Sequence, residues 1–269
     1  MKHILLLCSF FTLAFILFSC SSTKESTKEE PPSPPLPLVK RPTVPDINIR
    51  MASIDLSTVS RKIEKTDIEQ MAKILKENKI DIFAVQGVTR YPELKSRIDI
   101  VDEIAASTEM RKAFGENINI SGRQTGNAVF STYPIRSNDN TRYDHIRSAN
   151  FESALQAVID CGAKDVVVVS THLPEKASIE DQSACINTLS SFRTMYTDQP
   201  IVLIGNLPKS EVLQNLSGYE NSSRSKNLEG PNFWFSGERW ITLLHQNVET
   251  TPLGQLAIAE FGIYGKPHP

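Results

Sequence analysis

The stretch from Ala154 to Ser170 constrains the fold more than any other part of the sequence. Two apolar runs, Ala154–Ile159 and Val166–Ser170, have the length and composition of buried strands. Only the polar segment Asp160–Asp165 separates them. A parallel pair needs a crossover of about a dozen residues or more, so the two runs are predicted to form an antiparallel hairpin. A purely parallel sheet is therefore not expected.

Helical patterns alternate with strand patterns in the rest of the chain. Thr66-Asp67-Ile68-Glu69 has the pattern of a capping box, and apolar side chains then recur on one face up to Asn78. Further helices are predicted over Tyr91–Met110, from Ser178 onward and over Glu211–Leu216. Strands joined both by hairpins and by helices predict an α/β fold with mixed sheets covered by helices. The other predicted strands are Asp81–Val88, Asn127–Ser131, Ile201–Ile204, Trp240–Gln246 and Gln255–Phe261.

The N-terminus has the features of an export signal. Lys2 and His3 precede an apolar run over Ile4–Phe18, too short to span a membrane, and the run ends in Leu17-Phe18-Ser19-Cys20. This end resembles the lipobox at which bacterial lipoproteins are cleaved and acylated. We therefore expect residues 1–19 to be a lipoprotein signal peptide, with lipid attachment at Cys20 and a location in the cell envelope outside the cytoplasm. Ordinary signal cleavage and an uncleaved anchor are the alternatives.

Residues 20–45 have the composition of a tether. Ser21–Glu30 is polar and charged, and Pro31–Pro45 is rich in proline, which favours extended polyproline geometry over regular secondary structure. A ligand for a proline-binding module is the alternative function of this segment. The remaining residues, 46–269, have the length of one domain.

The charge balance argues against a nucleic-acid partner. The chain has 29 Lys and Arg against 31 Asp and Glu, a formal charge of −2, and loss of Lys2 with the signal makes it more negative. Proteins that bind nucleic acid usually carry a clear basic excess. The densest basic stretch, Arg136–Arg147, also contains two aspartates, and we interpret it as a solvated loop.

Two cysteines remain after the signal and Cys20 are set aside. Cys161 follows a predicted strand and Cys185 lies within a predicted helix. An exported protein allows a disulfide between them, and two separate buried thiols are the equal alternative. No spacing of cysteine and histidine indicates zinc.

Five segments, taken in order, resemble the signatures of the endonuclease/exonuclease/phosphatase superfamily, metal-dependent enzymes similar to pancreatic deoxyribonuclease I. The resemblance implies a four-layer α/β sandwich in which two packed mixed β-sheets are flanked by helices. It also implies a site where strand ends converge at one edge. The segments are Ile49–Leu56, Asp81–Val88, Gly126–Ile135, Val166–Leu173 and Ile201–Pro208.

The same resemblance identifies chemical groups that this chain lacks. The family's metal-binding Glu after Leu-Gln is Gly87 here, and the acid and amide of Gly-Asp-x-Asn are Asn206 and Pro208. The terminal Ser-Asp-His triplet aligns with Leu253-Gly254-Gln255, so Gln255 stands in place of the general base. Phosphodiester hydrolysis requires charge neutralisation, an activated water and a protonated leaving group. For each of these requirements, this chain lacks a residue that the family uses to meet it.

Three positions match or nearly match the family pattern. Asn127 occupies the place of a phosphate-contacting Asn, His172 that of a His that contacts the phosphate, and Asp55 that of a first-strand Asn. Each also has a structural explanation: Asn127 could satisfy a strand-end turn, His172 could be a hydrogen-bonded strand-end residue, and Asp55 could cap the loop after its strand. We favour the structural explanation for all three.

Three functions follow from these observations. The first is a lipid-anchored pseudoenzyme that acts by binding, with an unknown protein or a small phosphoester as its partner, no cofactor and no resident metal. The second is a phosphodiesterase, similar to a nuclease or sphingomyelinase, with an active site rebuilt from Asp55, Glu152 and His172 and served by Mg²⁺ or Mn²⁺. The third is a structural envelope protein, which an exposed aromatic patch around Trp234 would favour, although we expect Trp234 in the core.

Overall fold

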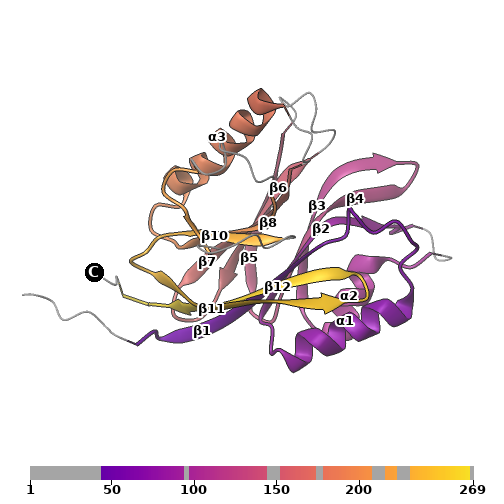
Figure 1. Cartoon of the computed structure of the whole chain (residues 1–269), viewed down its shortest axis with the longest axis horizontal. Coiled ribbons are helices and arrows are strands. Elements are labelled where there is room, and N and C mark those ends of the chain that lie inside the picture. The colour runs from indigo at the N-terminus through magenta and orange to yellow at the C-terminus, as the bar shows by residue number, and fades with distance from the viewer. Residues whose placement is uncertain are drawn as a thin grey trace, which may run out of the picture. The chain divides into compact units, whose positions relative to one another are not determined.

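The chain divides into two units, residues 1–39 and 40–269. A computed structural model describes residues 44–93, 97–143, 152–173, 178–207, 216–222 and 231–266, all within the second unit (Figure 1). Cys20, Pro208 and most of the predicted helix Glu211–Leu216 lie outside the described residues. No helix among the described residues is both long enough and apolar enough to cross a membrane.

Within the described residues the domain contains two six-stranded mixed sheets. The first has the order β11-β12-β1-β2-β4-β3, and the second the order β5-β6-β7-β8-β10-β9. The strands of the first sheet are β1 (Ile47–Asp55), β2 (Ile82–Arg90), β3 (Arg111–Ile120), β4 (Arg123–Ser131), β11 (Ile241–Thr251) and β12 (Gly254–Ile263). Those of the second are β5 (Ile135–Arg142), β6 (Ser153–Asp160), β7 (Asp165–His172), β8 (Ile201–Asn206), β9 (Glu220–Asn221) and β10 (Asn232–Ser236).

Each sheet contains one parallel pair among antiparallel ones. β1 pairs with β2 and β7 pairs with β8 in parallel, each pair joined through a helix. The predicted hairpin is confirmed, because β6 and β7 pair antiparallel from Ala154–Thr171 to Asp160–Asp165. The parallel pairs determine the position of the site, since their carboxyl ends meet at one edge of the molecule.

In the described part of the chain, three helices complete the four layers predicted from the sequence (Figure 1). α1 (Lys65–Glu77) and α2 (Ile100–Thr108) pack on the first sheet, and α3 (Ile179–Met195) packs on the second. A third apolar cluster, which includes Leu155, Phe233 and Phe261, fills the space between the sheets. Strands β1, β2, β7 and β8 are buried on both faces, which explains their continuous apolar runs.

Two predicted elements were wrong in detail. α2 was expected over Tyr91–Met110, but it begins after Asp99, whose side chain accepts from Asp102 N–H, and it ends at Glu109, a residue with a left-handed backbone. α1 has Glu64 as its N-cap in place of Thr66, and Asp67 accepts from Glu64 N–H at 2.9 Å.

Arg136–Arg147 was interpreted as a solvated loop, but its first part belongs to the edge strand β5. Most side chains of β5 are exposed, so its composition resembles that of a loop. An edge strand with polar and charged side chains is protected against pairing with other chains.

The two open questions about core residues have clear answers. Cys161 and Cys185 are buried free thiols, and burial raises the pKa of each to about 12. Cys161 lies in the cluster between the sheets, and Cys185 lies on the buried face of α3, in the cluster between that helix and the second sheet. Trp234 is 6% exposed and packs in the cluster beneath α3, as expected for a core residue.

Candidate functional site

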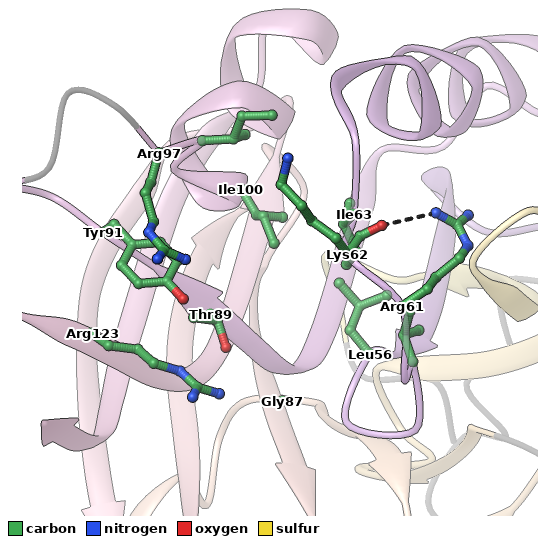
Figure 2. Close-up of a pocket in the computed structure, with 12 residues that line it drawn as sticks. Leu56, Arg61, Lys62, Ile63, Gly87, Thr89, Tyr91, Arg97, Ile100 and Arg123 are labelled. Atoms are coloured by element: carbon green, nitrogen blue, oxygen red, sulfur yellow. Dashed lines mark hydrogen bonds between the residues drawn. The ribbon is translucent and has the colours of Figure 1, made fainter.

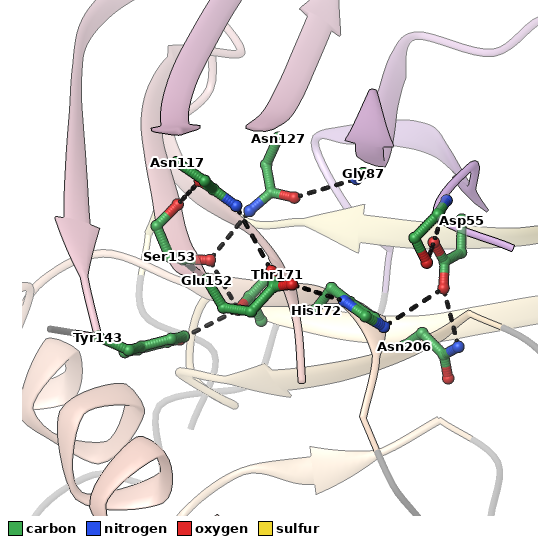
Figure 3. Close-up of polar contacts among 11 residues, drawn as sticks. Asp55, Gly87, Asn117, Asn127, Tyr143, Glu152, Ser153, Thr171, His172 and Asn206 are labelled. Carbon is green, nitrogen blue, oxygen red and sulfur yellow. Dashed lines mark hydrogen bonds and ion pairs between the residues drawn. The ribbon is translucent and has the colours of Figure 1, made fainter. Parts of the chain in front are cut away.

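Polar side chains gather where the parallel strands end (Figure 3). Asp55 is the last residue of β1, and His172 and Asn206 are the paired last residues of β7 and β8. Glu152 precedes β6, and Asn127 lies on β4. We call this set, with the adjoining Asn117, Ser153 and Thr171, the polar cluster.

His172 lies between two carboxylates. Its Nε2 is 3.7 Å from Asp55 Oδ2, and its Nδ1 is 3.4 Å from Glu152 Oε1. The side chain of His172 is 14% exposed and that of Asp55 only 5%. Because the two nitrogens lie on opposite sides of the imidazole, the ring separates the carboxylates (Figure 3).

Both carboxylate oxygens of Asp55 already accept from protein donors. Oδ1 accepts from Ser57 N–H at 2.9 Å and from Ser57 Oγ–H at 2.6 Å. Oδ2 accepts from the Asn206 amide at 2.9 Å. Asp55 therefore has the loop-capping contacts expected from its place after a strand, and Asn206 is held by Asp55.

Asn127 bridges the two sheets. Its Oδ1 accepts from Gly87 N–H at 3.4 Å, and its Nδ2 donates to the carbonyl of Ser153 at 2.9 Å. Thr171 Oγ1 donates to the same carbonyl at 3.0 Å. Asn127 is fully buried, so it connects the first sheet to the start of β6 and does more than satisfy a turn at the end of its own strand.

A second buried bridge lies beside the first. Ser53 Oγ–H donates to Gln86 Oε1 at 3.1 Å, and Gln86 Nε2 donates to Ser170 Oγ at 3.0 Å. Gln86 is fully buried and links β1, β2 and β7. Satisfied buried polar groups of this kind fix the register and relative placement of the elements that they join.

Gly87 lies at a bulge of β2, where the pairing with β4 shifts between Val85 and Val88. Its φ is +63°, a left-handed conformation that favours glycine. A Cβ placed on Gly87 would be 2.6 Å from Ser57 Cβ and 2.8 Å from Ser57 Cα. The loop after β1 therefore fills the space that a side chain at position 87 would need.

These residues do not fit the divalent cation that the fold family implies. Hard cations take several carboxylate or carbonyl oxygens that converge on one point. Within the described part of the chain, no three His, Cys, Asp or Glu side chains are arranged to hold a metal. Asp55 and Glu152 are separated by the His172 ring, and position 87 provides no ligand.

The structure does not bring Gln255 to the polar cluster. Gln255 is exposed in the β11–β12 hairpin, where it pairs with Thr250. Glu152 contacts His172, whereas the sequence indicated it only as a departure from the family pattern and as part of a rebuilt site. Asn117, Ser153 and Thr171 had no sequence signal, because their contacts join strands far apart in the chain.

A pocket of about 500 Å³ lies beside the polar cluster, and its wall includes Gly87, whose N–H donates to Asn127 of the cluster. Its wall includes four cationic side chains, those of Arg61, Lys62, Arg97 and Arg123 (Figure 2). We call it the arginine pocket. No sequence pattern indicated this pocket, because its cationic residues come from separate segments and form no motif. The other lining residues are Leu56, Val59, Ile63, Gly87, Thr89, Tyr91, Ile98 and Ile100.

Solved structures with similar folds are endonuclease/exonuclease/phosphatase proteins. One from Beutenbergia cavernae is 14% identical, with a TM-score of 0.63, and the match covers 82% of this chain and 73% of that one. One from Bacteroides vulgatus is 10% identical, with a TM-score of 0.62 and coverage of 81% and 99%. The human Nocturnin catalytic domain, solved with a bound sulfate anion, is 12% identical, with a TM-score of 0.62 and coverage of 81% and 94%.

No protein-family model and no curated protein matches the sequence. The domain has the endonuclease/exonuclease/phosphatase fold, with two packed six-stranded mixed sheets between helices. The fold expected from the five sequence segments is confirmed. Fold does not determine activity, so function is argued from the site.

Proposed function

We propose that this protein is a membrane-anchored bacterial lipoprotein whose endonuclease/exonuclease/phosphatase-like domain has lost catalysis and acts by binding. The observation that carries the proposal is Gly87. Where the family has a metal-binding carboxylate, this chain has a left-handed glycine packed against the backbone of Ser57.

The state of the neighbouring polar groups supports the proposal. Asp55 and Asn206 are hydrogen-bonded to each other, and Asn127 is committed to Gly87 and Ser153. The hydrogen bonds of these side chains are therefore made to one another and across the interface between the two sheets. A substrate phosphate would have to displace contacts that are already satisfied, at a cost of about 1–3 kcal/mol for each buried group left unpaired.

Hydrolysis assays test the proposal directly. The full chain is incubated with DNA, RNA, bis(p-nitrophenyl) phosphate and sphingomyelin in Mg²⁺ and in Mn²⁺. We expect turnover no greater than that of buffer, because metal ligand, acid and base each contribute orders of magnitude to rate. Metal-dependent turnover in the wild type that vanishes in His172→Ala would overturn the proposal.

A rebuilt phosphodiesterase site is the second candidate, and one observation favours it. His172 contacts both Asp55 and Glu152, so a histidine with two carboxylate neighbours exists at the edge where family active sites lie. Such a histidine could accept a proton from water. Mn²⁺ titration followed by electron paramagnetic resonance separates the candidates: this one requires a bound ion that is lost in Asp55→Asn with Glu152→Gln.

Membrane attachment through Cys20 is tested separately. In cells, the wild-type chain is expected in the membrane fraction, with an acylated N-terminal cysteine detectable by mass spectrometry. Cys20→Ser is expected to abolish acylation. An unmodified Cys20 in a chain cleaved elsewhere would contradict the lipid anchor and leave the proposed role of the domain untouched.

A further inference from the structure

The arginine pocket has the size and composition of a small-molecule site. Its volume of about 500 Å³ lies within the range of roughly 300–1,000 Å³ typical of ligand pockets. The β1–α1 loop forms one wall with Val59 and Ile63, and the segment after β2 forms another with Tyr91 and Ile98. A ligand that fills it would contact both apolar and cationic side chains.

Two of the four cations are neutralised by neighbouring acids. Arg61 forms two hydrogen bonds with Asp67, at 2.6 and 2.8 Å, and Lys62 pairs with Glu64 at 3.0 Å. The Arg61 guanidinium also donates to the Lys62 carbonyl (Figure 2). Among the residues that the structure describes, no carboxylate lines the pocket itself. Arg61 and Lys62 are therefore largely committed to acids outside the pocket wall.

Arg97 and Arg123 differ from that pair. Arg97 lies over the ring of Tyr91, 5.0 Å from its centroid, a contact that restricts the guanidinium. Among the described residues, neither Arg97 nor Arg123 pairs with a carboxylate. In Figure 2 both guanidinium groups lie on the same side of the pocket as the hydroxyls of Tyr91 and Thr89. This side therefore presents positive charge and hydrogen-bond donors without a protein anion to receive them.

We propose that the arginine pocket binds a phosphomonoester that carries an apolar or aromatic group. Two uncompensated guanidinium groups match the double charge and several oxygens of a phosphomonoester better than a single carboxylate. The ester group then contacts Val59, Ile63 and Ile98. The inference rests on the proposed binding role, since it names the ligand that the domain binds.

The pocket is chemically separate from the polar cluster. Gly87 lines the pocket and donates its N–H to Asn127 of the polar cluster, and the loop after β1 fills the space that a side chain at position 87 would need. None of Asp55, Asn127, Glu152, His172 and Asn206 lines the pocket. Ligand binding therefore does not require the contacts of the polar cluster to break.

Calorimetric titration of the full chain with phenyl phosphate tests the proposal. We expect saturable binding, weakened about tenfold or more in Arg97→Gln with Arg123→Gln, since each guanidinium–phosphate contact is a charge-assisted pair. Both side chains are exposed, so the variant is expected to fold. The matched control, Arg111→Gln with Arg239→Gln, removes two exposed charges outside the pocket and is expected to bind like the wild type.

The same titration distinguishes failure of this inference from failure of the proposed function. Absence of phenyl phosphate binding, or equal affinity in the double variant and its control, would overturn the pocket assignment alone. Metal-dependent release of phenol that His172→Ala abolishes would overturn the non-catalytic role. Binding without phenol release supports both.

A second ligand identifies the source of the phosphomonoester. Dihexanoyl phosphatidic acid is a dispersed lipid with the same head group, and its affinity is compared with that of phenyl phosphate. Tighter binding of the lipid assigns the site to a lipid head group, and tighter binding of phenyl phosphate assigns it to a soluble ester. In either case, weaker binding in Arg97→Gln with Arg123→Gln supports the proposal, and unchanged binding in that variant contradicts it.

Discussion

The polar cluster and the arginine pocket lie side by side, but they differ in whether their polar groups have partners within the protein. In the cluster, Asp55, Asn127 and Asn206 are buried or partly buried and bonded to other protein groups. In the pocket, Arg97 and Arg123 are exposed and, within the described residues, have no carboxylate partner. Satisfied buried groups hold a fold together, and uncompensated charges around a cavity favour a ligand. The edge inherited from the fold and the surface suited to binding are therefore different places.

The largest expected effect comes from restoring a side chain at Gly87. Gly87→Ala forces Cβ into Ser57 and keeps a positive φ, so we expect a loss of about 3 kcal/mol or more in the free energy of unfolding. Gly122→Ala is the control, because Gly122 also has a positive φ but has nothing within 4 Å of the added Cβ. That variant should lose only about 1 kcal/mol. Urea denaturation measures both, and equal losses would show that Ser57 yields easily.

A double variant, Gly87→Glu with Asn206→Asp, would restore the two carboxylates that the family resemblance implies at these positions. It meets the same steric obstacle at Ser57. The new glutamate has no room beside Ser57, and the new aspartate would face Asp55, which now accepts from the Asn206 amide. We expect loss of stability and no metal-dependent turnover of bis(p-nitrophenyl) phosphate. Turnover in this variant would mean that the domain retains the other groups that catalysis requires.

Removal of the Asn127 bridge should have the next largest effect. Asn127→Ala leaves two backbone groups, Gly87 N–H and the Ser153 carbonyl, without this partner, although Thr171 still donates to the carbonyl. We expect a loss of about 2 kcal/mol, measured by urea denaturation. Asn138→Ala on the exposed edge of β5 is the control and should change stability by no more than about 0.5 kcal/mol. A similar small change at Asn127 would refute its role as a bridge.

The pH dependence of stability tests the pairing of Asp67 with Arg61, one of the two neutralised cations of the arginine pocket. Hydrogen bonds from Arg61 and from Glu64 N–H lower the pKa of Asp67 to about 2. Because the folded-state pKa lies below the unfolded value, the ionised carboxylate stabilises the fold above about pH 4, and this contribution is lost as the pH falls towards 2. With solvent screening, we expect it to be of the order of 1 kcal/mol. Asp67→Asn should remove this contribution near neutral pH and equal the wild type near pH 2. A difference that persists at pH 2 would contradict the assignment.

The smallest effect is expected at Tyr91. Tyr91→Leu removes the ring under Arg97 and should weaken phenyl phosphate binding about two- to fivefold, the size of an exposed cation–π contact. Tyr91→Phe keeps the ring and should bind like the wild type. If the two variants weaken binding equally, the hydroxyl rather than the ring contributes to binding.

Local sequence patterns predicted the interior of this fold better than its edges. The hairpin of β6 and β7 and the buried runs of β2 and β8 followed from short apolar segments and a connection too short for a crossover, whereas β1 was indicated only by the family resemblance. β3 and β5 were missed because edge strands carry polar side chains and lack the apolar alternation of a strand. α2 was predicted too long because the side chain of Asp99 caps its start and the left-handed backbone of Glu109 ends it, and apolar spacing reports neither.

The location of the candidate site in the fold could be predicted, but the contacts between its side chains could not. The resemblance implied that strand ends converge at one edge, and the ends of β1, β7 and β8 meet through Asp55, His172 and Asn206. The placement of His172 between Asp55 and Glu152 depends on two sheets packing in one relative position, which no local pattern encodes. The same holds for Arg97 and Arg123, which meet at one pocket from segments on either side of α2 and β3.

Cys161 and Cys185 make the two halves of the interior separately observable. One thiol lies between the sheets and the other on the buried face of α3, and burial raises the pKa of both to about 12. A disulfide reagent reacts with thiolates, so each cysteine can react only when its own layer opens. The reaction rates of Cys161→Ser and Cys185→Ser chains would thus report whether helix α3 detaches before the sheets separate, or whether all four layers open at once.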